Sequence, residues 1–316
     1  MKILLLANQP ESTTRLHLFR NTLTYLGHQV IVPKFGTRNW FSIAVQSRGL
    51  IKKERPEVVH IFNVPDIIYR KIPELKGNYF QKLIYDYRSP WGIETEMNFG
   101  TPGRIFAEHF EKGLAKEADL ITCVNSPLKE KVKSFLSDDH KKICVIPNYP
   151  EKRFLESTGS PGIPQYDVQK PVLFVGRVCT QEGIANFIQS ARDMPDFDFW
   201  IVGDGPFSWW HLMNKPKNIS FFGWQEHKKV AGFISQSALC LIPRNVNALT
   251  SYSNDKSIWK LNEYLNLGKI VIASGISVEE ERKNLIVVST EDLNETIKMY
   301  IRLSAVKFNE FELFCT

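Results

Sequence analysis

Cysteine is scarce in this sequence, and its few cysteines lie far apart. No two of them form a Cys-x-x-Cys pair, which disfavours a structural zinc site and a disulfide framework. An odd number of scattered thiols is typical of a reducing compartment, so we expect free cysteines and a cytoplasmic protein. The five are Cys123, Cys144, Cys179, Cys240 and Cys315.

Long apolar runs are also lacking. The run within residues 1–7 turns polar at Asn8 and is too short for the core of a signal peptide. No stretch approaches the roughly 18 consecutive apolar residues that a membrane-spanning helix needs. We therefore expect a protein that is soluble or bound peripherally to a membrane.

Charge of one sign is only mildly in excess. The 40 lysine and arginine residues outnumber the 34 aspartate and glutamate residues, which gives a formal net charge of +6. This excess fits a phosphate-bearing ligand or an anionic membrane surface without choosing between them. The basic residues are scattered and no nucleic-acid-binding motif is present, so we expect no nucleic-acid partner.

What the chain does contain is an alternation of short apolar runs with amphipathic stretches such as residues 13–26 and 105–116. Runs that are apolar on both faces and separated by helices indicate parallel sheets covered on both sides. The predicted strands are residues 2–7, 29–33, 58–62, 82–87, 120–124 and 143–146, and then residues 171–176, 197–202, 219–222, 238–242, 270–273 and 285–288.

A pause in this alternation divides the chain. Residues 154–170 hold two glycines and two prolines with little periodicity, which is typical of a linker. We therefore predict an α/β protein with two Rossmann-like, doubly wound parallel-sheet domains that face each other across a cleft. The domains are residues 1–153 and 171–302, and residues 303–316 can pack back on the first.

Loops that follow strands are where ligands bind in open α/β sheets. Gly176 and Arg177 follow a predicted strand; glycine allows close approach of the backbone, and the planar guanidinium fits phosphate oxygens. Gly203 lies in a similar position within residues 201–206. Taken alone, the first pair is more typical of a surface turn, and the second of a tight strand-to-helix turn with a structural role.

The most informative stretch is residues 254–268, which predict one helix that begins at Asn254 or Asp255. Free N–H groups and the positive dipole end make a helix start a natural phosphate site. Lys256 and Lys260 add positive charge there.

Two acidic residues on this predicted helix are spaced to hold a long ligand. Asp255 and Glu263 are eight residues apart, which corresponds to about 12 Å along a helix axis. One carboxylate is then placed for hydroxyls of a transferred sugar and the other for those of a ribose. A capping aspartate and a solvated glutamate are the alternative, and the spacing alone favours that alternative.

In their order along the chain, these segments resemble the retaining glycosyltransferases of family 4 (glycosyl transferases group 1), which have the GT-B fold. The last segment is the most specific, because it is similar to the family pattern KLxEYxxxGKPVVAS. The resembling segments are Leu26–Val30, Val58–His60, Ala118–Ile121, Val145–Asn148, Phe174–Arg177, Gly203–Gly205, Ile219–Trp224 and Lys260–Leu265 with Gly268–Ser274.

The resemblance implies a role for each matching residue. Arg177 corresponds to the arginine that binds the diphosphate and stabilises the departing nucleotide, Asp255 to the acid that contacts the transferred sugar, and Glu263 to the acid that binds the ribose. The expected catalytic residues are therefore Arg177, Asp255 and Lys260. The expected donor-binding residues are Glu263, Lys256, Ser257, Gly176, Gly203 and Arg88.

Three positions depart from the family pattern. Asp255 is one methylene shorter than the usual glutamate. The family's phosphate-binding lysine falls on Glu182, just before Gly183, which reverses a charge where an anion is expected to bind; Lys256 or Lys260 can compensate. Arg88 stands near the position of a frequent donor-pocket histidine, and a surface ion pair is the alternative for it.

The activity implied is transfer of a sugar from a nucleoside-diphosphate sugar to an acceptor hydroxyl with retention of anomeric configuration, of the hexosyltransferase type. The expected acceptor is a glycan, a lipid-linked sugar or a small molecule. No metal or other cofactor is expected, because no Asp-x-Asp motif follows a predicted strand. Residues 40–45, before several basic residues, are expected to begin an amphipathic helix, with contact to a membrane surface as the alternative.

Rival functions remain on the same fold. A sugar-nucleotide epimerase and a non-catalytic GT-B partner subunit are the alternatives, and the departures at Asp255 and Glu182 motivate the second. A nicotinamide-dependent dehydrogenase is disfavoured, since neither residues 7–10 nor residues 176–179 supply Gly-x-Gly-x-x-Gly.

Overall fold

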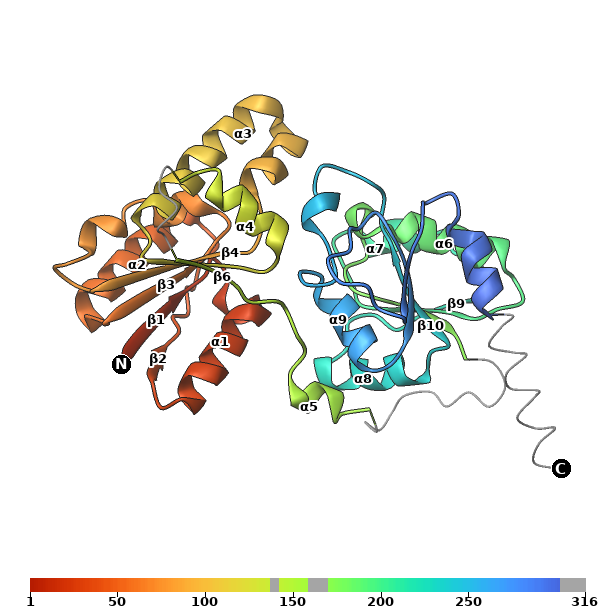
Figure 1. Cartoon of the computed structure of the whole chain (residues 1–316). Coiled ribbons are helices and arrows are strands. Elements are labelled where there is room, and N and C mark those ends of the chain that lie inside the picture. Colours follow the sequence, from red (N-terminus) through yellow and green to blue (C-terminus); the bar gives the residue numbers. More distant parts are fainter. Residues whose placement is uncertain (137–141, 159–169, 302–316) are drawn as a thin grey trace. The chain divides into compact units, whose positions relative to one another are not determined.

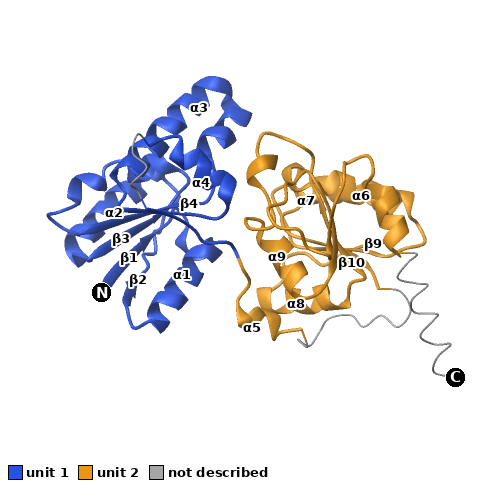
Figure 2. Cartoon of the chain, in the orientation of Figure 1, with its two compact units in different colours: residues 1–148 blue, residues 149–316 orange. Residues whose placement is uncertain are grey.

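The computed structural model describes residues 1–136, 142–158 and 170–301. The chain divides into two compact units, residues 1–148 and 149–316 (Figure 2). Most of the expected linker and the whole of residues 303–316 lie outside the described residues. Each unit is built on one six-stranded sheet in which every strand pair is parallel.

Unit 1 has the strand order β2-β1-β3-β4-β5-β6, so the order reverses between β1 and β3. Its strands are β1 (Lys2–Leu6), β2 (Gln29–Ile31), β3 (Val58–Phe62), β4 (Lys82–Tyr87), β5 (Leu120–Cys123) and β6 (Lys142–Val145). Its helices are α1 (Thr14–Tyr25), α2 (Trp40–Glu54), α3 (Trp91–Glu117) and α4 (Ser126–Lys133), with short 3-10 turns η1 (Pro10–Ser12), η2 (Asp66–Tyr69) and η3 (Pro73–Leu75).

The sheet of unit 1 is covered on both faces. Every residue of β3 is buried, which is why its sequence shows no alternation and has His60 as its single polar residue. Leu16 of α1 packs with Ile3 and Leu5 of β1 on one face. In Figure 1, α3 and α4 lie on the opposite side of the sheet from α1.

Helix α3 is a hairpin of two helical segments rather than one rod. The predicted helix at residues 105–116 is its second segment, and the first begins at Trp91. The chain reverses at Gly100, which has a φ of 66°. The Thr95 hydroxyl donates to the carbonyl oxygen of Gly103 at 3.0 Å and so ties the two segments together.

Unit 2 has the strand order β12-β11-β10-β7-β8-β9, which reverses between β7 and β10. Its strands are β7 (Val172–Val175), β8 (Phe199–Val202), β9 (Ile219–Phe221), β10 (Leu239–Pro243), β11 (Ile270–Ser274) and β12 (Leu285–Val287). Its helices are α5 (Lys152–Leu155), α6 (Ile184–Asp193), α7 (Ser208–Leu212), α8 (His227–Gln236) and α9 (Trp259–Asn266), with η4 (Thr180–Glu182), η5 (Thr250–Tyr252) and helical residues 293–301.

Alternate strand residues of unit 2 pack into two separate hydrophobic cores, one on each face of the sheet. Leu173 packs with apolar side chains of α8 and α9 on one face of the sheet. Its neighbours Val172 and Phe174 pack with those of α6 and of residues 293–301 on the other face. The prediction of parallel α/β sheets covered on both sides is therefore confirmed, and each of the twelve predicted strands corresponds to an observed one.

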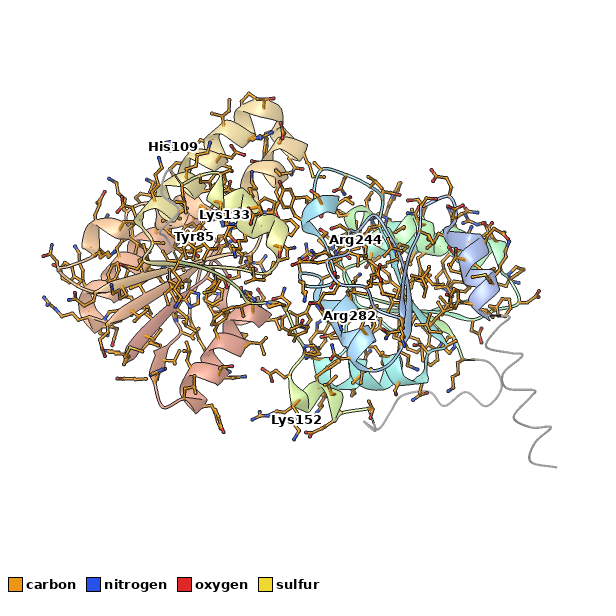
Figure 3. All side chains as sticks on the ribbon, in the orientation of Figure 1. Tyr85, His109, Lys133, Lys152, Arg244 and Arg282 are labelled. Carbon is orange, nitrogen blue, oxygen red and sulfur yellow. The ribbon has the colours of Figure 1, made fainter. Side chains whose placement is uncertain are left out.

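Unit 1 buries a cluster of two acids and two tyrosines beneath α3. Tyr85 of β4, labelled in Figure 3, donates a hydrogen bond to Asp66 of η2. Tyr87 donates to Oε1 of Glu111 at 3.0 Å. Burial is the main reason that the pKa of Asp66 lies well above its usual range and that of Glu111 rises to about 7.

This raised pKa predicts a stability that falls as pH increases. The unfolded chain loses the Glu111 proton near pH 4.5, whereas the folded chain keeps it to about pH 7, so the free energy of unfolding declines across that interval. Glu111→Gln keeps the acceptor for Tyr87 without titrating. We expect the free energy of unfolding of this variant to decline less with pH than that of the wild type. At pH 8 the variant should be more stable by about 1–3 kcal/mol.

Urea unfolding at pH 5, 7 and 8 measures this difference. Glu117→Gln, an exposed position of the same helix, is the matched control and should follow the wild type at each pH. Parallel curves for Glu111→Gln and wild type would contradict the assignment.

Candidate functional site

The carboxyl ends of β7 and β10 lie side by side where the strand order of unit 2 reverses, which is the position at which open α/β sheets bind ligands. Gly176 follows β7 and has a φ of 141°, and Gly203 follows β8 with a φ of 132°. A Cβ atom at Gly203 would lie 2.0 Å from the carbonyl oxygen of Gly176. Both expected glycines therefore let two loops pack closely at this edge of the sheet.

A three-residue ionic cluster occupies this edge. Lys260 of α9 places its Nζ 2.7 Å from Oε2 of Glu182, the last residue of η4. Arg244, directly after β10, donates to Oε1 of Glu182 at 2.7 Å and to Oε2 at 3.3 Å (Figure 3 labels Arg244). The three side chains come from three segments that converge at the strand reversal.

The electrostatics of the cluster are set by burial and by the pairing. Burial alone would raise the pKa of Glu182, but Lys260 and Arg244 hold it at about 2. Burial lowers the pKa of Lys260, and Glu182 opposes that change. The Lys260 ammonium also lies 4.3 Å from the centre of the Phe174 ring. It is packed so closely that a Cβ at Gly176 would come within 2.9 Å of Nζ.

The expected phosphate ligand Arg177 differs from these two cations. It is exposed, and no described carboxylate lies within ion-pair distance of it. Its Cγ would lie 3.2 Å from a Cβ at Gly205, so its stem rests on the loop that follows β8. Arg177 thus presents an unneutralised guanidinium at the same edge as the cluster.

Glu263 has a partner that the sequence analysis missed. Its Oε1 lies 2.6 Å from Nε2 of His227 at the start of α8. The ring of His227 stacks on Phe154 with centroids 4.4 Å apart. The hydrogen bond with Glu263 is the main reason that the pKa of His227 is raised. No motif surrounds His227, so only the fold brings this pair together.

The predicted helix over residues 254–268 is wrong at its start, because α9 begins at Trp259. The Asn254 side chain accepts from the backbone N–H groups of Lys256 and Ser257 at 3.0 and 3.2 Å, and this turn competes with the helix. Asp255 therefore precedes the helix, and the 12 Å axial spacing to Glu263 that was estimated from helical rise does not apply.

Three expected ligand-binding residues in that turn already have partners within the chain. Asp255 is fully buried, and its Oδ1 accepts from the backbone N–H of Glu279 at 2.7 Å. Lys256 forms an ion pair with Glu280. The Ser257 hydroxyl donates to the carbonyl oxygen of Tyr252 at 3.1 Å. The first two contacts join this turn to the segment after β11. The second Asp255 oxygen has no hydrogen-bond partner among the described residues.

Arg88 lies in unit 1, directly after β4, where its Nε donates to the carbonyl oxygen of Asn63 at 3.0 Å. The Asn63 side chain in turn accepts from the Arg88 backbone N–H at 2.9 Å and donates to Ser89 at 2.7 Å. These bonds fix the loops after β3 and β4 against each other.

Unit 1 has a second buried polar network at this end of its sheet. Arg15 of α1 donates from Nε to Oδ2 of Asp86 at 2.7 Å and from Nη1 to the carbonyl oxygen of Ile146 at 2.7 Å. His60 lies near them inside β3, and burial lowers its pKa to about 4. The sequence signal for this network was Asp86 itself, a charged residue within an apolar strand.

The described residues contain no group of three His, Cys, Asp or Glu side chains placed to hold a metal ion. In the part of the chain that the structure covers, no helix is long and apolar enough to cross a membrane. Helix α2 forms as expected at residues 40–54, and it exposes Trp40, Phe41 and Val45.

Comparison with known proteins identifies the fold. Residues 169–305 match the family model described as glycosyl transferases group 1. No curated protein sequence matches the chain. A sucrose-phosphate synthase from Thermosynechococcus elongatus has a similar structure, with a TM-score of 0.73 and 14% identity over 96% of this chain and 89% of that one.

Two further solved structures are similar at comparable coverage. An alpha-glucosyltransferase in complex with UDP-glucose and DNA has a TM-score of 0.64 and 13% identity over 96% of this chain and 90% of that one. The Anabaena protein HepE in complex with UDP has a TM-score of 0.57 and 11% identity over 95% and 89%. The chain has the GT-B fold, and the match over unit 2 supports a glycosyltransferase of that fold.

Proposed function

We propose that the protein is a glycosyltransferase that moves a sugar from a nucleoside-diphosphate sugar to an acceptor hydroxyl with retention of anomeric configuration. The observation that carries the proposal is the position of three cations at the strand reversal of unit 2, on the segment that matches the glycosyltransferase family model. Arg244 and Lys260 share the ionic cluster, and Arg177 lies two residues after β7. Glu263 lies three residues after Lys260 on α9, hence on a neighbouring position of the same helix face.

In this mechanism the protein supplies binding and electrostatics. The bond from the anomeric carbon to the diphosphate breaks as the acceptor oxygen bonds to that carbon on the same face, and the acceptor proton passes to the departing phosphate. Arg177 stabilises the charge that develops on that phosphate. Glu263 holds the ribose hydroxyls. No step needs a metal, because protein cations take the place of one.

The neighbours whose structures contain UDP or UDP-glucose support a nucleoside-diphosphate donor. For the acceptor we propose a glycan, a lipid-linked sugar or a small molecule in a cytoplasmic setting. The exposed Trp40 and Phe41 of α2 suit a peripheral membrane contact. One neighbour is in complex with DNA, so the fold gives no support to the expectation that nucleic acid is excluded.

Glu263→Ala tests the donor site. We expect it to weaken binding of the preferred nucleoside diphosphate at least tenfold, since a buried carboxylate that accepts two ribose hydroxyls contributes about 1.5–3 kcal/mol. Isothermal titration calorimetry with uridine, guanosine and adenosine diphosphates first identifies the base and then measures the loss. Glu291→Ala, an exposed position in the same unit, is the control. An affinity that Glu263→Ala leaves unchanged rules out the ribose role.

A second candidate is a non-catalytic GT-B partner subunit. It is favoured by Glu182, which neutralises cations at the expected phosphate position, and by the burial of Asp255. A chain that binds no sugar nucleotide but copurifies with an active transferase would support it over the enzyme.

A further inference from the structure

The carboxylate of Glu182 lies where an anionic ligand is expected. Its two oxygens contact cations from different segments, Lys260 on α9 and Arg244 after β10, with closest distances of 2.7 Å to each. Both cations are largely buried, with side chains 11% and 19% exposed. In the described part of the chain, Glu182 is the carboxylate that both of them contact.

Two glycines, Gly183 and Gly176, lie beside this carboxylate and its cations. Gly183 directly precedes α6, lies in the left-handed region and supplies no capping side chain. A Cβ there would lie 1.7 Å from the carbonyl oxygen of Pro243, so the turn is fixed against the end of β10. Gly176 leaves room for the Lys260 ammonium in the same way. Two largely buried cations and two glycine turns therefore meet at the strand reversal. Together they form a site for an anion with more than one oxygen.

We propose that Glu182 is an internal anion that occupies this site, and that the phosphate groups of a diphosphate ligand must displace it to reach Arg244 and Lys260. The inference rests on the proposed function for the identity of the ligand but not for the existence of the site. Each oxygen of the carboxylate does what a phosphate oxygen would do, and the cluster of two cations and one carboxylate keeps a net charge of +1 for the ligand.

We expect displacement to involve the Glu182 side chain and the turn that carries it. Glu182 ends the three-residue turn η4, and the other two residues of that turn, Thr180 and Gln181, are exposed. The Glu182 side chain is 22% exposed, so it has a path to solvent. The pKa of about 2 means that it stays charged at every pH at which the protein is handled. A ligand therefore always competes with a full negative charge.

Removing the charge of Glu182 should increase the affinity for anionic ligands. Glu182→Gln leaves both cations in place without their internal anion, so we expect inorganic pyrophosphate and the preferred nucleoside diphosphate to bind at least tenfold more tightly than to the wild type. If Glu182 instead only positions the cations, the same variant binds both ligands more weakly. Calorimetric titration of the full chain measures the sign directly, and Glu295→Gln, an exposed carboxylate paired with Lys298, is the control.

Two further variants distinguish an effect on anion binding from an effect on protein stability. Glu182→Asp keeps the charge and should bind pyrophosphate like the wild type, which holds even if Glu182→Gln proves unstable in thermal unfolding. In an Arg244→Gln background the gain from Glu182→Gln should shrink, because one of the released cations is missing. A full gain in that background, or a gain in Glu182→Asp equal to that of Glu182→Gln, would overturn the proposal.

The outcome for the proposed function is separate. Tighter pyrophosphate binding by Glu182→Gln, with no nucleoside diphosphate bound by any variant, keeps the internal anion and rejects the donor site. Nucleoside diphosphate binding that depends on Glu263, with no gain in Glu182→Gln, keeps the donor site and rejects the internal anion.

Discussion

Arg15→Met is expected to destabilise unit 1 by about 3–5 kcal/mol, because it leaves a fully buried carboxylate without its counter-charge. Arg15 is 5% exposed and Asp86 is 0% exposed, and their contact distance is 2.7 Å. The other Asp86 oxygen has no hydrogen-bond partner among the described residues. Arg15 also donates to Asn148 at 3.0 Å, so one side chain joins α1, β4 and the segment after β6.

Urea unfolding of the full chain, followed by circular dichroism, measures this loss. Arg20→Met, an exposed position of the same helix, is the control and should change stability by less than about 0.5 kcal/mol. The double variant Arg15→Met with Asp86→Leu should recover much of the loss, since no unpaired charge remains in the core. If the double variant is as unstable as the sum of both single changes, the ion pair is not the cause.

The strands of this protein could be predicted from its sequence because a buried strand needs an apolar side chain at almost every position. A strand covered on both faces, such as β3, shows no alternation of apolar and polar residues, and His60 is its single polar position. The carboxyl ends of such strands then follow from parallel topology, so Gly176, Gly203 and Arg88 were expected at strand ends and are found there. Their placement needs no knowledge of side-chain contacts.

The site could be predicted only where one segment carries the chemistry. Lys260 and Glu263 were both expected on one helix, and both lie on α9. Arg244 and His227 were missed, because their partners Glu182 and Glu263 are 62 and 36 residues away in the sequence. Asp255 was misplaced for a local reason: a side-chain turn at Asn254 delays the helix, and helical periodicity does not detect such a turn.

Arg177→Ala should lower kcat of glycosyl transfer by about 10²–10³-fold, the usual cost of removing one donor from a site where transition-state charge develops. Arg177 differs from Arg244 and Lys260 in that no described carboxylate neutralises it. Its full charge is therefore available to a departing diphosphate, while the other two are shared with Glu182. Arg192→Ala, an exposed position on α6, is the control and should retain wild-type kcat.

The comparison between turnover and binding shows how Arg177 acts. If it stabilises the leaving group, kcat falls far more than affinity for the nucleoside diphosphate does, because the charge is greatest when the glycosidic bond breaks. An equal loss in donor affinity with kcat intact would instead mean that Arg177 binds donor and transition state alike. A variant with both properties unchanged would leave Arg244 and Lys260 as the groups that meet the phosphate. In that case Glu182→Gln, which releases those two cations, becomes the variant with the larger effect on turnover.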